Sequence, residues 1–206
     1  GLLFSKLPKK KREQDPLLSA CWDAARMMAR SPDHERELCK WTDQLFGGKH
    51  LKETDSQRRL RHAACLLADT GWLTHPNYRG ERSLTMVSEA SFTGVDHPGR
   101  IFLALAVYFR YEGPMAENAP EELLSLIDGD MVHRARIIAA AQRLAYVLSG
   151  AMPGMLPKIK IKLKKKKHLE LELPPKLANL RGERVEKRLL DLAILMGFRA
   201  KIKTSI

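Results

Sequence analysis

Apolar residues recur at intervals of three and four positions over most of the first 150 residues, the spacing that gives a helix one buried face. The clearest stripe predicts a central buried helix that begins near Ser56. Asp69 falls one turn before the expected end of this helix, and Gly71 is expected to stop it in the left-handed conformation. A lone carboxylate is therefore predicted at the inner mouth of a helical bundle. The stripe consists of Leu60, Ala63, Ala64, Leu66 and Leu67.

Capping and stop signals predict the other helices. Asp15-Pro16 combines an N-cap residue with proline at the first helical position, and Ser31-Pro32 repeats that signal. Gly113-Pro114 ends a strongly apolar segment. The expected helices cover residues 16–29, 32–46, 83–90, 100–111, 120–126 and 130–148.

The pattern changes after residue 150. Residues 158–163 and 168–173 alternate between apolar and charged side chains, as half-buried strands do, and Lys164 to Lys167 lie between them as a hairpin. A helix over residues 182–196 and a third strand over 198–204 follow. We therefore predict a mainly α protein, with a helical bundle in residues 1–155 and a small α+β module of ββαβ order in residues 156–206.

The positive charge is concentrated in this last module. Residues 158–206 hold 15 Lys and Arg and 5 Asp and Glu, a balance of +10, which leaves +2 of the total of +12 for residues 1–157. Such a surface suits an anionic polymer, because each phosphate contact releases counterions. No apolar run approaches the roughly 18 residues of a membrane span. We expect a cytoplasmic protein without a membrane partner, and the initial Gly1 suggests a piece of a longer chain.

Three cysteines also bear on the expected location of the protein. Cys21, Cys39 and Cys65 are odd in number and lie in apolar helical patterns. They are therefore expected to be buried thiols and not a disulfide framework or a zinc site.

Several segments of the helical region resemble the C-terminal region of the exopolyphosphatase and guanosine pentaphosphate phosphatase family. Leu67-Ala68-Asp69-Thr70-Gly71 is similar to the family's Leu-His-Asp-Ile-Gly, and Asp15-Pro16-Leu17-Leu18 to one of its helix starts. Tyr108-Phe109-Arg110-Tyr111 and Arg143-Leu144-Ala145 match in the same order. The resemblance implies an HD-like bundle followed by the small terminal domain that many members carry.

An HD bundle holds a divalent metal with a histidine, a His-Asp pair and a further aspartate. By the resemblance His34 and Asp69 match two of these positions, whereas Ala68 replaces the paired histidine and Tyr146 the last aspartate. Two ligands do not define a hydrolytic metal site, so we expect no metal here. We expect His34 and Asp69 to pair with each other or with neighbouring backbone.

The resemblance places hydrolysis in catalytic domains upstream, which would use Mg²⁺. No phosphate-binding glycine loop and no nucleophile-histidine arrangement occurs in this sequence, so no catalytic residue is assigned. The chain would then be the non-catalytic C-terminal half of an exopolyphosphatase, which helps to bind polyphosphate and to form a homodimer. The same region occurs in guanosine pentaphosphate phosphatases, so that alternative stays open.

Three basic clusters are candidates for contact with an anionic chain. The hairpin lysines have no predicted partners, whereas lysines on the strands face glutamates across the hairpin. Arginines at the start of the central helix oppose its dipole, which favours a functional role for them. The candidates are Lys164, Lys165, Lys166 and Lys167; Arg58, Arg59 and Arg61; and Lys9, Lys10, Lys11 and Arg12.

Two further hypotheses remain. An RNA-binding module in the basic tail is disfavoured because Phe198 is the only aromatic residue after Tyr146, and base recognition usually needs stacking. A metal-dependent HD phosphohydrolase would need substitute ligands, for which His75 and His97 are the candidates.

Overall fold

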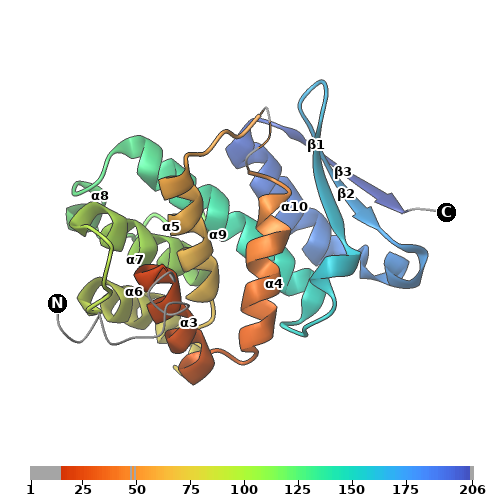
Figure 1. Ribbon diagram of the computed structural model, residues 1–206. Helices are drawn as coiled ribbons and strands as arrows, with labels where there is room; N and C mark the ends of the chain where they lie inside the picture. The colour runs from red at the N-terminus through yellow and green to blue at the C-terminus, as the bar shows by residue number, and fades with distance from the viewer. Residues whose placement is uncertain (1–14, 47, 49, 205–206) are drawn as a thin grey trace.

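A computed structural model describes residues 15–46, 48 and 50–204. Helices gather on one side of the molecule, and a three-stranded sheet lies at the opposite end (Figure 1). The helical side contains α3 (Pro16–Met28), α4 (Pro32–Asp43), α5 (Asp55–Leu66), α6 (Arg79–Glu89), α7 (His97–Glu112), α8 (Glu121–Leu124) and α9 (Gly129–Ser149). The sheet end contains β1 (Lys160–Lys164), β2 (His168–Leu173), α10 (Glu183–Met196) and β3 (Arg199–Thr204).

The predicted capping signals are confirmed at several helix ends. The Asp15 carboxylate accepts hydrogen bonds from the backbone N–H groups of Leu17 and Leu18, at 2.9 and 3.1 Å, and so starts α3. Gly113 ends α7 with φ of 123°, a backbone conformation that favours glycine, and its N–H bonds to the Phe109 carbonyl. Each predicted helix is present, although α6 begins four residues earlier than expected.

The central helix is shorter than the sequence predicts. It begins after Thr54, whose side chain forms a reciprocal capping box with Gln57, and it ends at Leu66. Asp69 therefore lies in the turns that follow α5, and the prediction that Gly71 ends the helix is wrong. Gly71 is needed for close packing instead, because a Cβ atom there would lie 2.2 Å from Ser83 Oγ and 2.9 Å from the Tyr111 ring.

The core is formed around α5, α7 and α9. Ala63 and Ala64 of α5 have no exposed surface, and neither do Leu103, Leu105 or Ile138. Small residues on α5 let the neighbouring helices approach closely, and the apolar area removed from water is the main stabilising term. This packing fixes the ends of α7 and α9, which carry residues of the candidate site.

The terminal module has the predicted ββαβ order. Strand β2 pairs antiparallel with β1, Ile161 facing Leu171, and parallel with β3, Leu171 facing Ile202. Strand β1 begins at Lys160 and not at Lys158, because Leu156–Lys158 forms a 3₁₀ turn. Helix α10 packs against both α9 and the sheet (Figure 1). The division near residue 155 stays a prediction.

The three cysteines are buried free thiols, as expected. Burial raises the pKa of Cys21 to about 12.

Among the residues that the structure describes, no helix is long and apolar enough to cross a membrane.

Candidate functional site

The four residues that the resemblance matches to HD metal ligands lie at the end of the bundle where α4, α9 and the turns after α5 meet. His34 is fully buried, with Nδ1 3.2 Å from Glu35 Oε1 and Nε2 2.8 Å from Ser149 Oγ. The Tyr146 hydroxyl donates to the same Glu35 oxygen at 2.5 Å. Burial raises the pKa of Glu35, and it raises that of Tyr146 well above its usual range. Glu35, which sequence reasoning missed, is thus the partner of both residues.

Asp69 is held by arginine and not by His34, so the expected His34–Asp69 pair is not formed. The Arg30 guanidinium donates from Nε to Asp69 Oδ2 at 2.7 Å and from Nη2 to Oδ1 at 2.9 Å. The Arg30 backbone N–H adds a third bond at 3.2 Å. Arg110 Nη2 lies 3.5 Å from Oδ1. Arg30 therefore supplies the positive charge next to this carboxylate that a metal ion would supply in an HD site.

The residues at this position do not fit a divalent metal. Ala68 and Tyr146 offer no suitable ligands, and both oxygens of Asp69 are engaged by guanidinium groups. In the described parts of the chain, no group of three or more His, Cys, Asp and Glu side chains could hold a metal ion. His75 and His97 are exposed residues at the starts of η1 (Pro76–Tyr78) and α7, outside any such group.

The arginines that hold Asp69 also line a pocket of about 500 Å³. Helices α6, α7, α9 and α10 contribute to its wall, together with the turn between α3 and α4. The arginines in its lining are Arg30, Arg79, Arg110, Arg143, Arg184 and Arg188. In the sequence they are single arginines spread over more than 150 residues. Arg110 and Arg143 lie in segments on which the resemblance rests, but no pattern in the sequence brings the six together.

The hairpin lysines lie at the turn between β1 and β2, which projects from the sheet (Figure 1). Lys164 Nζ is 4.0 Å from Glu170, whereas Lys165, Lys166 and Lys167 form no ion pair with the described residues. Lys162 is bonded to Glu172 at 2.7 Å, the strand pairing that the alternation predicted. Three consecutive lysines at the turn are therefore open to solvent.

The three arginines at the start of α5 are engaged in ion pairs. Arg61 is fully buried and bonds to Glu53, to Thr42 Oγ1 at 2.7 Å and to Asp43 at 2.8 Å. Such a side chain has no surface on which to meet a polymer, so its expected binding role is replaced by a structural one. Arg59 pairs with Asp15, and Arg58 lies 3.3 Å from Asp43. Lys9, Lys10, Lys11 and Arg12 lie outside the described residues.

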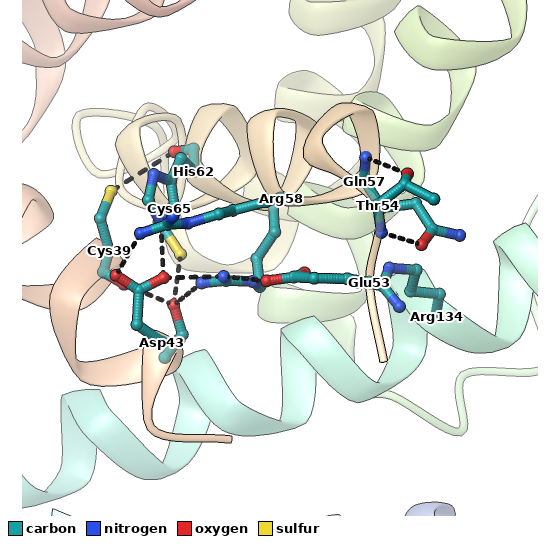
Figure 2. A network of polar contacts seen from close by, with 11 residues as sticks. Cys39, Asp43, Glu53, Thr54, Gln57, Arg58, His62, Cys65 and Arg134 are labelled. Atoms are coloured by element: carbon teal, nitrogen blue, oxygen red, sulfur yellow. Dashed lines mark hydrogen bonds and ion pairs between the residues drawn. The ribbon is translucent and has the colours of Figure 1, made fainter. Parts of the chain in front are cut away.

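The surroundings of Arg61 form a dense polar network between α4, α5 and α9. Glu53, labelled in Figure 2, accepts hydrogen bonds from Arg61 on one side and from Arg134, at 2.5 Å, on the other. Burial alone would raise the pKa of Asp43, but hydrogen bonds from Arg61 and His62 outweigh it, so this pKa lies below its usual range. We call Arg61, Arg134, Glu53 and Asp43 the Glu53 cluster.

Comparison with protein-family models matches residues 17–203 to a family described as the C-terminal region of exopolyphosphatase. The match covers both the helical part and the terminal module. A search of curated proteins finds no match.

Proposed function

The chain belongs to the exopolyphosphatase C-terminal family, and on this premise we propose that it is a non-catalytic region that binds inorganic polyphosphate and contributes to a homodimer. The observation that carries the binding proposal is the lysine turn between β1 and β2. Lys165, Lys166 and Lys167 are exposed there without an ion-pair partner in the described part of the chain. Cations in this state gain most from an anionic chain, because they give up no existing partner.

The scarcity of aromatic side chains near the lysines indicates which polyanion they bind. A polymer without bases needs charge but no stacking surface, and the terminal module has only Phe198 as an aromatic side chain. Polyphosphate meets this description better than RNA does.

The proposal excludes hydrolysis by this region itself. Arg30 occupies the carboxylate of Asp69, so a metal-activated water has no place to form there. Hydrolysis with Mg²⁺ would belong to catalytic domains upstream in the same protein. A metal-dependent HD phosphohydrolase would instead require stoichiometric bound metal by elemental analysis.

The dimer proposal has support on α10. Leu190 and Ile194, one helical turn apart, are 49% and 64% exposed. Exposed apolar side chains at this spacing suit contact with a second copy. Sedimentation of the protein over a concentration series tests this part.

The binding proposal is tested with long-chain polyphosphate over a salt series. The change is replacement of Lys164, Lys165, Lys166 and Lys167 by serine. The slope of log affinity against log salt should fall by about 0.7 for each phosphate that the variant no longer neutralises, as for a single-stranded polyanion. The matched control replaces Lys40, Lys187, Lys201 and Lys203, four exposed lysines elsewhere, by serine.

If both variants weaken polyphosphate binding equally, the hairpin lysines contribute only through the general positive charge of the protein. No binding by the unchanged protein at moderate salt would reject the polymer role. Tighter binding of single-stranded RNA than of polyphosphate would favour the RNA-binding alternative, and preference for guanosine pentaphosphate would favour the phosphatase of that substrate.

A further inference from the structure

The arginine-lined pocket has a strong excess of positive charge, and nothing in its lining balances it. All the charged residues in its wall are arginines. Among them, Arg30 and Arg110 share the single carboxylate of Asp69, and Arg188 lies 3.4 Å from Asp191. The six guanidinium groups thus contact two carboxylates, which leaves four positive charges. We call this site the arginine pocket.

The remaining arginines are satisfied by neutral groups or by none. Arg79 donates to the backbone carbonyls of Thr74 and Trp72, at 3.0 and 3.1 Å. Arg143 Nη1 donates to the carbonyls of Arg110 and Tyr111, both at 2.7 Å. Arg184 is exposed on α10 and forms no ion pair with the described residues. Carbonyl oxygens orient the guanidinium groups without cancelling their charge, so the arginines are held in place for an anion.

Two buried donors in the wall have no partner among the described residues. Arg110 Nε and Arg143 Nε are inaccessible to solvent and make no hydrogen bond there. Buried polar atoms in proteins are nearly always bonded, so each such exception needs an explanation. A small shift of either side chain toward an anion in the pocket would give these N–H groups an acceptor.

The environment of Arg143 adds to this picture. Burial, followed by repulsion from Arg188 and Arg110, lowers its pKa to about 10, although Asp191 and Glu112 act in the opposite direction. Arginines this close raise each other's free energy when no anion lies between them. An anion would remove that repulsion.

We propose that the arginine pocket is a binding site for a short inorganic phosphate chain, in which guanidinium groups do what a metal ion does in an HD site. The choice of phosphate rests on the proposed function of polyphosphate binding and on the donors themselves. Planar guanidinium groups match pairs of phosphate oxygens, and several of them are needed to balance a ligand with more than two negative charges. The Tyr146 ring in the pocket is not free to contact the ligand, because guanidinium groups already cover it. The guanidinium carbons of Arg30 and Arg110 lie 5.5 and 3.9 Å from the centre of the ring.

The location separates this site from the lysine hairpin. The pocket takes its wall from the ends of α7 and α9 and from α10, whereas the hairpin projects from the sheet. A long polymer can contact exposed lysines at many positions along its length, whereas a pocket of this size admits only a few phosphates. We therefore assign the pocket to a short chain or to the end of a long one.

The test is calorimetric titration of the protein with tripolyphosphate, in buffer without divalent ions. Arg184 and Arg188 lie on the more exposed side of the pocket, so Arg184→Ser with Arg188→Ser should leave the fold intact. Removal of two charge-assisted hydrogen bonds should weaken tripolyphosphate binding about 100-fold. The control, Lys187→Ser with Arg199→Ser, removes the same charge from exposed residues outside the lining and should have little effect.

Arg143→Gln gives a second, independent variant from the α9 side, with the same expected loss. The serine variant of Lys164 to Lys167 should keep its tripolyphosphate affinity. One-to-one binding that fails in both pocket variants and survives in both controls supports the site. Absence of tripolyphosphate binding, or equal weakening by the pocket and control pairs, overturns it.

The two proposals fail separately. Long-chain binding without tripolyphosphate binding would reject the arginine pocket and keep the polymer role. Tripolyphosphate binding without long-chain binding would keep the pocket and reject the polymer role.

Discussion

Two groups of arginines, most of them buried or half-buried, occur in this protein, and they differ in what surrounds them. In the Glu53 cluster, Arg61 and Arg134 meet two carboxylates, and the more exposed Arg58 pairs with one of them, Asp43. The Glu53 side chain is only 4% exposed. In the arginine pocket, six arginines meet two carboxylates and backbone carbonyls. The charges of the first group are nearly balanced, whereas the second group keeps a large excess of positive charge. The presence of arginine is therefore a poor guide to function. Whether nearby carboxylates neutralise its positive charge is a better one.

The difference follows from the position of each group in the fold. The Glu53 cluster joins the segment before α5 to α4, α5 and α9, so its bonds stabilise the bundle directly. The arginine pocket lies where helix ends meet, and the Arg143 guanidinium bonds to two carbonyls in the last turn of α7. Cations are favoured at helix C-termini. That interaction holds Arg143 in place and leaves its remaining N–H groups for a ligand.

Glu53→Gln should have the largest effect on stability, and it tests whether the Glu53 cluster is structural, in contrast to the arginine pocket. This change leaves Arg61 buried with one charge partner fewer, and removal of one member of a buried pair typically costs about 3–5 kcal/mol. Urea unfolding followed by circular dichroism measures the loss. Glu183→Gln, an exposed change on α10, is the control. A loss below about 1 kcal/mol would mean that the Glu53 cluster is not a structural element.

Asp69→Asn tests the arginine pocket in the same way, and its expected effect on stability is smaller. Arg30 and Arg110 are deprived of their shared anion, which should lower the free energy of unfolding by about 2 kcal/mol, the range for hydrogen bonds to charged groups. The same change removes a negative charge next to the arginine pocket, so tripolyphosphate should bind more tightly. Calorimetry and unfolding on one sample measure both effects. Weaker binding together with lower stability would show that Asp69 holds the arginines in position more than it competes with the ligand.

The smallest expected effect is on the acid stability of the Glu53 cluster. The folded pKa of Asp43 lies below its ordinary value, so its contribution is complete above the unfolded pKa of about 3.9 and is lost as the pH falls through the folded pKa. The difference in unfolding free energy between the unchanged protein and Asp43→Asn should therefore narrow below about pH 4. Unfolding curves at about pH 6 and about pH 3 measure this. A difference that grows toward low pH would contradict the role of Asp43.

Local signals predicted most of the fold. Asp15-Pro16 and Gly113 act at the helix ends where the sequence places them, and the alternation around Lys162 gives the observed strand pairs. The error at Gly71 has a physical cause. A glycine after an apolar stripe suggests a left-handed stop, but here the Ser83 and Tyr111 side chains from α6 and α7 occupy the space where its Cβ would lie. Only the tertiary packing distinguishes the two reasons for glycine.

The site was less accessible to sequence reasoning. The resemblance drew attention to His34 and Asp69, and the structure brings both to the same end of the bundle, but their partners, Glu35 and Arg30, carry no pattern of their own. Arg61 was expected to bind a polymer because of its position at a helix start. Its burial depends on Glu53 and Asp43, which lie on either side of a loop. Charge compensation between distant segments cannot be seen in a linear pattern.

The wall of the arginine pocket has a consequence for the order of events during synthesis. Arg30 leaves the ribosome early, whereas Arg184 and Arg188 leave it more than 150 residues later. At synthesis rates of about 5–20 residues per second, the bundle, which ends with α9 at Ser149, has about 2–7 s in which to pack before α10 begins at Glu183. The pocket is therefore completed last, and it exists only in chains whose terminal module has docked on α9.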